Sequence, residues 1–490
     1  MVFKHLSRLF KHSVLYGLSE TISRGTGFVL VFIYVKALTQ AELGIRTEFY
    51  AASAFLALFY TFGLDNAFLR YFMDEEFADK RDRILSSSLY FTILTGLIFY
   101  IAAFIAGDSI SFIIAENSSY VYITHLLFAI LILDTVVIYP TLILRAENRF
   151  RYYFLISITR FVLFIVLNIL FIVFFGRGVN GVFEANLIVV LIVFFMLLPV
   201  YRKYFSGKLS FAILKRLLYL GVPTIFTLLA IRIIDLADRR IILYFFDESH
   251  VAQYAVPYTL GMAGIMVFVN SFRIAWQPFY LSIGTNPDAK NIFSKTATYY
   301  ALFISVMFLG IVLFRNEIFI LFTILNPSEY PVILADIIPF VSISYVIYGF
   351  YFIMLAGVFL KEKTIVLPIA TCIGAAVNVG LNFLFIPRFG IIGASYTTII
   401  AYTIMVMLLY FLSRNIYHIK YEFKRLTVVF LITAIPIIVS LVYVPGGIFA
   451  SLLFKSLLLL VPFAVFYFSG FLGEEEKRFV KHKISSIISE

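Results

Sequence analysis

Long runs of apolar residues, separated by short polar stretches, recur along the whole chain. Each run is about 20 residues long, which is the length that a helix needs to cross a bilayer. The runs predict fourteen membrane-spanning helices, which cover roughly residues 13–37, 45–68, 84–106, 120–144, 152–175, 180–200, 217–246, 252–281, 296–321, 331–358, 365–387, 390–413, 426–445 and 447–469. The seventh and eighth runs are longer than a bilayer requires. We expect each to be tilted or broken, with Pro223 and Pro257 as candidate break points.

Composition supports an all-α polytopic membrane protein. The 490 residues are 62% hydrophobic and the mean hydropathy is +0.98, whereas soluble domains are about 45–50% apolar. No polar stretch between the runs is long enough for a soluble enzyme domain, so we do not expect an enzyme. The polar stretches are the connections between predicted spans.

The charge balance agrees with a membrane protein. A net charge of +11 in a soluble protein would suggest nucleic acid as a partner. Here 27 of the 39 Lys and Arg residues fall on one side of the predicted topology and seven on the other. Because positive charge favours the cytoplasmic side, both termini are predicted to be cytoplasmic. The bilayer, and not nucleic acid, is the expected partner.

The chain lacks the common signals for catalysis, metals and processing. Its one cysteine, Cys372, lies in an apolar run and excludes disulfides within the chain and cysteine-based metal sites. There is no P-loop and no metal-ligand spacing, so we expect no cofactor apart from a coupling ion, H⁺ or Na⁺. The first apolar run carries Glu20 and Arg24 and is too long for a cleavable signal.

An internal repeat predicts two lobes. Residues 167–176 read LNILFIVFFG and residues 381–390 read LNFLFIPRFG, with seven of ten positions identical at an offset of 214. Because six spans separate the matches, the repeat is predicted to be parallel, with a pseudo-two-fold axis along the membrane normal. We expect a lobe of six helices in 1–216, a second in 217–425, and an extra helix pair with a cytoplasmic tail in 426–490. Chance similarity between apolar runs is the alternative.

Charged residues inside the predicted spans are the candidate site. A charge near the bilayer centre costs roughly 2.5–3.5 kcal/mol on insertion scales, so such residues usually face other helices or water. At 100° per residue, Arg232, Asp235 and Arg239 lie within about 60° of one another on a helix and form a charged strip. We expect this strip to line a polar cavity.

Further charges inside spans extend the candidate set. Glu20 and Arg24 can pair at i, i+4 on the first span. The predicted anion-binding residues are Arg24, Arg160, Arg232, Arg239 and Arg273; the predicted ion-coupling or charge-pairing residues are Glu20, Asp65, Asp134, Asp235 and Asp238. Ion pairs that only fix helix packing are the alternative. For Asp65, which precedes a turn, a capping role is favoured, and Arg273 lies close enough to a bilayer face to snorkel.

Several stretches together resemble one known family. They are Tyr16-Gly17-Leu18-Ser19 with Arg24, Ala41-Glu42-Leu43-Gly44 with Thr47-Glu48, Phe62-Gly63-Leu64 through Arg70-Tyr71-Phe72, Asp238-Arg239 with Ile241 and Leu243, Ala275-Trp276-Gln277-Pro278-Phe279, and Leu381 to Pro387 with Phe389 to Ala394. In this order they resemble the bacterial Wzx-like, O-antigen type flippases of the multidrug/oligosaccharidyl-lipid/polysaccharide exporter superfamily. The resemblance covers spans one to twelve.

The resemblance implies a function. It implies a transporter of the bacterial inner membrane that moves an undecaprenyl-pyrophosphate-linked oligosaccharide to the outer leaflet by ion-driven alternating access, for surface polysaccharide or lipopolysaccharide synthesis. It carries over Arg24 and Asp238-Arg239 as family positions. Further membrane proteins of polysaccharide assembly are candidate partners.

Three other functions stay open. A multidrug or small-molecule exporter of the same superfamily would typically have twelve spans and a less basic cavity. A flippase for a peptidoglycan or teichoic-acid precursor would have the same physical features as the favoured function. A membrane glycan polymerase or ligase would be expected to carry a large outer loop with catalytic residues, which this chain does not have.

Overall fold

The computed structural model describes residues 30, 33–34, 36–323, 330–468 and 471, and its regular elements in these ranges are helices. The α-helices are α2 (Gln40–Thr61), α3 (Leu64–Phe72), α4 (Arg81–Ile105), α5 (Gly107–Ala115), α6 (Val121–Ala146), α7 (Phe150–Asn168), α8 (Gly178–Tyr204), α9 (Phe211–Phe245), α10 (Glu248–Ile283), α11 (Ala289–Leu313), α12 (Arg315–Thr323), α13 (Ile337–Leu360), α14 (Val366–Phe389), α15 (Ile391–Ile416), α16 (Phe423–Val442) and α17 (Ile448–Phe468). Short helical segments are η1 (Glu75–Lys80), η2 (Ser118–Tyr120), η3 (Ile169–Phe174, a π-helix) and η4 (Val332–Asp336).

The number of spans agrees with the sequence. Twelve helices of the described residues are long and apolar enough to cross a membrane, and the bent pair of α2 and α3 makes a thirteenth span. Each matches one of the predicted runs from the second onward. The predicted first span, 13–37, lies almost entirely outside the described residues. An all-α, multi-pass membrane protein is therefore confirmed.

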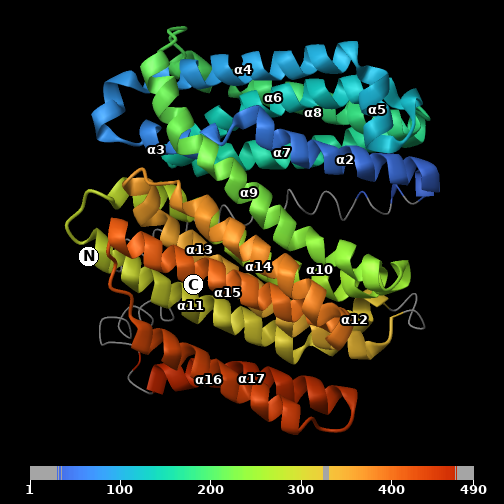
Figure 1. Cartoon of the computed structure of the whole chain (residues 1–490), viewed down its shortest axis with the longest axis vertical. Coiled ribbons are helices and arrows are strands. Elements are labelled where there is room, and N and C mark those ends of the chain that lie inside the picture. The colour runs from blue at the N-terminus through green and yellow to red at the C-terminus, as the bar shows by residue number, and fades with distance from the viewer. Residues whose placement is uncertain (1–29, 31–32, 35, 324–329, 469–470, 472–490) are drawn as a thin grey trace, which may run out of the picture.

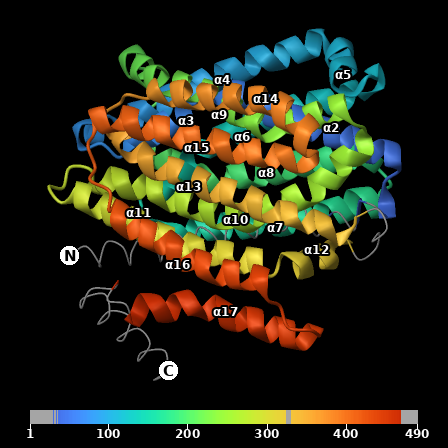
Figure 2. The same ribbon diagram turned by 60° about the horizontal axis from the view of Figure 1, so that its bottom comes forward.

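The helices form three groups along the long axis of the molecule (Figure 1). Helices α2–α8 make up the first helix group and α9–α15 the second helix group, with α9 crossing from one to the other. Helices α16 and α17 form a terminal pair at the edge of the second group, against α11 (Figure 2). The predicted boundaries at 216/217 and 425/426 stay predictions.

The prolines do not break the long helices. Helices α9 and α10 run without interruption for 35 and 36 residues with Pro223 and Pro257 inside them, so the predicted break points are wrong. Transmembrane helices tolerate proline because neighbouring groups satisfy the freed backbone carbonyls. The break falls instead between α2 and α3, which meet at an angle of 46°. There Phe62 and Gly63 both have positive φ.

A close helix approach explains where this break lies. A Cβ atom built on Gly63 would lie 2.3 Å from the carbonyl oxygen of Gly221 in α9 and 2.2 Å from Oγ1 of Thr224. Glycine at position 63 therefore serves two needs, because it adopts φ +68 and lets the backbone touch α9.

The two matched segments occupy equivalent places. Each ends a helix, and the closing glycines, Gly176 and Gly390, have φ values of +62 and +67. Asn168 and Asn382 are both fully buried, and each amide oxygen accepts a hydrogen bond from a hydroxyl group. The seven identities thus preserve a buried amide and a turn, which favours a true repeat over chance similarity.

Many Lys and Arg residues lie where α3, α6, α8 and α13 end and where α4, α9 and α14 begin. These helix ends lie on the left in Figure 1. We call this end of the molecule the basic end. Lys203 donates to Glu147 at 2.5 Å here, so part of the charge is used in ion pairs between helix ends. The positive charge predicts that the basic end faces the cytoplasm.

Candidate functional site

One charged pair lies in the first helix group. Arg160 of α7 donates from Nη2 to Oδ1 of Asp134 in the neighbouring helix α6, at 2.7 Å. Both residues lie near the middle of their spans, yet their side chains are 43% and 32% exposed. Since an accessible ion pair at this depth is unfavourable in hydrocarbon, we expect the pair to face water or a polar ligand. Sequence reasoning selected both residues but did not predict that they pair.

Arg46 lies in the same helix group, and the sequence analysis did not select it as a site residue. Its guanidinium carbon is 4.3 Å from the ring centre of Tyr34 and 5.0 Å from that of Tyr50. Its Nε is buried and has no hydrogen-bond partner among the described residues. The sequence interpretation counted Arg46 with an outer connection, because it stands at the start of the second apolar run. Tyr50, one turn later on the same face of α2, was the only local sequence feature that could have indicated this contact.

The second helix group holds an aspartate in a cage of tyrosines. Oδ1 of Asp235 on α9 accepts hydrogen bonds from Tyr402 of α15 at 2.8 Å and from Tyr345 of α13 at 2.9 Å. The hydroxyl of Tyr258 on α10 lies 2.6 Å from that of Tyr345. Because the hydrogen of Tyr345 goes to Asp235, Tyr258 must donate to Tyr345. Helices α9, α13 and α15 thus meet at one carboxyl group, and α10 joins them through Tyr258.

Two arginines flank Asp235 on α9. Arg239 places its guanidinium carbon 5.0 Å from the ring centre of Tyr258, and Arg232 is exposed. Both lie within electrostatic reach of Asp235. The charged strip expected from helical spacing is present in the fold, while its role in binding stays a prediction.

Asp238 has a different environment. It is fully buried and accepts from the hydroxyl of Tyr254 at 2.7 Å and from the backbone N–H of Arg239 at 2.8 Å. These contacts link α9 to α10. This carboxyl group is therefore less accessible than Asp235, and its proposed coupling role stays a prediction.

Arg273 and Asp65 lie nearer the basic end. Arg273 of α10 is exposed and its guanidinium carbon is 5.4 Å from the ring centre of Phe352. Asp65 is partly buried in the first turn of α3, where acidic residues are favoured. Arg273 and Arg145 are within electrostatic reach of Asp65. Arg145, counted from sequence as a loop residue, instead ends α6 and donates to the carbonyl of Ile274 at 2.9 Å.

Glu20 and Arg24 lie outside the described residues. Within the residues that the structure describes, no group of three or more His, Cys, Asp and Glu side chains could hold a metal ion. The arrangement is suited to binding an anion through guanidinium groups and an ion or proton through carboxylates.

A family model described as polysaccharide biosynthesis protein matches residues 9–283, which is more than half of the 490 residues. An uncharacterized membrane protein of Methanocaldococcus jannaschii is 24% identical over 439 residues, covering 82% of this chain and 83% of that protein.

Solved structures of transporters share the fold. A MATE protein in a straight conformation has a TM-score of 0.70 at 19% identity, covering 86% of this chain and 96% of that one. A mutant of the Vibrio cholerae MATE transporter VcmN has a TM-score of 0.72 at 16% identity, covering 84% and 96%. A transporter of the same superfamily from Pyrococcus furiosus, described as having a binding pocket of reverse polarity, has a TM-score of 0.68 at 19% identity, covering 86% and 96%.

The family model agrees with the polysaccharide flippases that the sequence motifs resemble, the solved structures confirm the fold, and the O-antigen type stays a prediction. The chain belongs to the polysaccharide biosynthesis protein family, and its fold is that of the MATE transporters of the multidrug/oligosaccharidyl-lipid/polysaccharide exporter superfamily.

Proposed function

We propose that this protein is a flippase that moves an undecaprenyl-pyrophosphate-linked oligosaccharide across the bacterial inner membrane, from the cytoplasmic to the outer leaflet. The observation that carries the proposal is the pair of charged clusters inside membrane spans, one in each helix group, in which the arginines are not fully buried. The first contains Arg160 with Asp134, and the second contains Arg232, Asp235 and Arg239.

The chemistry of the headgroup supports this substrate. A pyrophosphate diester keeps its negative charges at neutral pH, and removing them from water is the main cost of crossing the bilayer. Guanidinium groups bind phosphate oxygens with paired N–H donors and keep their charge in apolar surroundings. Arginines on both helix groups would offset the desolvation at either stage of alternating access.

Two carboxyl groups are proposed to couple transport to H⁺ or Na⁺. Asp235 offers a carboxylate whose hydrogen bonds come from neutral tyrosines, so binding of a cation would not break an ion pair. Asp134 would be released from Arg160 when a phosphate takes its place. Substrate binding and ion binding would then act on the same side chains.

Deletion in the host tests the function. Loss of a surface glycan, with its undecaprenyl-linked unit accumulating in the cytoplasmic leaflet, would support the proposal and identify the glycan. Complementation with Arg160→Ala and Arg232→Ala should fail although both variants insert normally. Arg388→Ala, which removes an exposed arginine in the last turn of α14, is the matched control and should complement.

A second candidate is a multidrug exporter. The observation that favours it is the MATE fold of the similar solved structures. An exporter of cationic drugs would leave the surface glycan intact on deletion and would produce sensitivity to those drugs. That result would replace the flippase proposal.

A further inference from the structure

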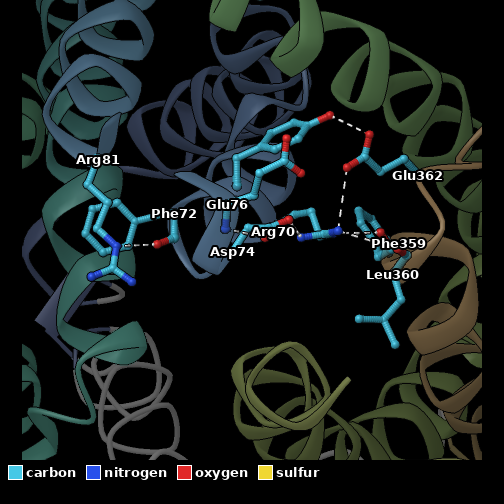
Figure 3. A network of polar contacts seen from close by, with 9 residues as sticks. Arg70, Phe72, Asp74, Glu76, Arg81, Phe359, Leu360 and Glu362 are labelled. Atoms are coloured by element: carbon cyan, nitrogen blue, oxygen red, sulfur yellow. Dashed lines mark hydrogen bonds and ion pairs between the residues drawn. The ribbon is translucent and has the colours of Figure 1, made fainter. Parts of the chain in front are cut away.

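Arg70 connects the two helix groups at the basic end (Figure 3). It ends α3 in the first group and reaches the turn between α13 and α14 in the second. Its Nε donates to the carbonyl of Phe359 at 3.1 Å, and Nη2 lies 3.5 Å from the carbonyl oxygen of Leu360 and 3.6 Å from Oε1 of Glu362. One guanidinium thus contacts the last two residues of α13 and Glu362 in the turn that follows.

The contact is reinforced on both sides. The hydroxyl of Tyr71 donates to Oε2 of Glu362 at 2.9 Å, so each carboxylate oxygen has a partner in the first group. Asp74 accepts from Nη1 of Arg70 at 2.5 Å and fixes the guanidinium from its own helix group. The side chain of Arg70 is only 13% exposed, which limits the screening of these charges by water.

The backbone of the turn indicates the same role. Glu362 has φ +54, in the left-handed region that residues other than glycine seldom adopt. Such a conformation persists where the surrounding contacts hold it. The hydrogen bonds from Arg70 and Tyr71 are contacts of this kind, and they come from the other helix group.

Other contacts close the same end. The backbones of Gly63 and Gly221 touch, since a Cβ on Gly221 would lie 2.9 Å from the carbonyl oxygen of Gly63. Asn66 accepts from Gln277 of α10 at 3.4 Å. A glycan headgroup cannot enter between helix groups that are joined by backbone contact and hydrogen bonds.

We infer that this structure is closed at its basic end, and that Arg70, Tyr71 and Glu362 form a latch that must open before a substrate can enter there. The inference rests on the proposed transport and on the prediction that the basic end is cytoplasmic. In the closed state each polar group of the latch is satisfied. Opening exposes Arg70 and leaves it with Asp74 alone, so the latch favours the closed state between transport cycles.

The distance between the helix groups tests the latch without any substrate. Spin labels are attached to Ala78→Cys in η1 and Ile365→Cys before α14, two exposed uncharged positions, with Cys372→Ser removing the native thiol. Electron–electron resonance in lipid nanodiscs then gives the distribution of distances at the basic end. Glu362→Gln and Tyr71→Phe should each raise the open-to-closed ratio by roughly tenfold, the effect of losing one charge-assisted hydrogen bond.

The controls make the result decisive. Tyr71→Phe retains the ring that packs on Phe77 at 5.2 Å, so it changes the hydroxyl and not the core. Lys363→Gln removes an exposed charge beside Glu362 and should leave the distances unchanged. Parent-like distances in both latch variants, or an equal shift in Lys363→Gln, would overturn the inference. If the latch variants shift the spin-label distances as expected but the parent protein does not transport the glycan, the result would count against the proposed substrate alone.

Discussion

Removing the guanidinium of Arg160 tests whether this residue binds the substrate or only stabilises the fold. Arg160→Ala deletes the 2.7 Å contact with Asp134. Two unit charges at that separation attract by about 1.5 kcal/mol in water. Measured values for exposed pairs are about 0.2–1 kcal/mol, because ordering the side chains and screening by salt reduce the gain. Since the two side chains are 43% and 32% exposed, we expect the variant to lose at most about 1 kcal/mol of stability.

The expected effect on transport is larger. A folded domain has about 5–15 kcal/mol of stability, so a loss of 1 kcal/mol leaves the variant folded. A guanidinium that binds a phosphate contributes about 1.5–3 kcal/mol per charged hydrogen bond. Losing one such bond lowers the rate or affinity roughly 10–100-fold. Transport should therefore fall by at least tenfold while stability barely changes.

The assay measures both quantities on the same preparation. The purified variant is reconstituted into vesicles, and the movement of a labelled undecaprenyl-pyrophosphate oligosaccharide is followed by its accessibility to an outside probe. Thermal unfolding in detergent reports stability, and Arg388→Ala is the control. A parent-like rate for Arg160→Ala would refute the binding role. A stability loss far above 1 kcal/mol would refute the assignment of the pair to an accessible surface.

The remaining predictions concern coupling, packing and pH. Asp134→Asn should change the dependence of transport on pH or Na⁺ in vesicles, and an unchanged dependence would exclude it from coupling. Gly221→Ala should raise the open population at the basic end, because its Cβ would lie 2.9 Å from backbone atoms of α2–α3; spin-label distances check this. Lys455→Ala should lower stability by at most about 1 kcal/mol through loss of its ion pair, because the side chain of its partner Glu317, 2.6 Å away, is 34% exposed and water can replace part of the contact; thermal unfolding measures the loss. Burial raises the pKa of Glu147, but hydrogen bonds from two side chains of α8 outweigh it and hold the pKa below its usual range. The stabilisation is therefore complete above about pH 4.3 and is lost as the pH falls through the lowered pKa, so Glu147→Gln should remove this part of the acid sensitivity in unfolding curves.

The spans could be predicted because the bilayer fixes their length and polarity. Thirteen predicted spans match helices in the described residues, including the overlong α9 and α10. The position of the break in the second span could not be predicted in the same way. It depends on the contact of Gly63 with α9, some 160 residues later, and not on local helix-breaking residues such as Pro223.

The candidate site was only partly predictable. Helical spacing placed Arg232, Asp235 and Arg239 on one face, because three residues on one helix share a geometry that sequence alone defines. The tyrosines around Asp235 come from three other helices, and nothing in their local sequence marks them among 32 tyrosines. Tertiary packing alone brings them to the carboxyl group.

The latch was even harder to predict, because it too depends on tertiary packing that local sequence does not show. Arg70 and Glu362 are separated by more than 290 positions, and each lies in a polar stretch that the sequence identified only as part of a basic connection. Charge counting assigned Arg70 correctly to the basic end. It could not distinguish a residue that interacts with lipid headgroups from one that joins two helix groups.

The accessible charges of the site explain why an anion suits it. Among the site charges that are not fully buried, the arginines are Arg46, Arg145, Arg160, Arg232, Arg239 and Arg273, and the carboxyl groups are Asp65, Asp134 and Asp235. Arginine therefore exceeds carboxylate by three among these described residues, with the fully buried Asp238 left out. A pyrophosphate diester carries one negative charge on each phosphoryl group, so it would neutralise two charges of this excess. A cationic drug would instead add to it, and could be accommodated only where carboxylates are left unpaired, as Asp235 is.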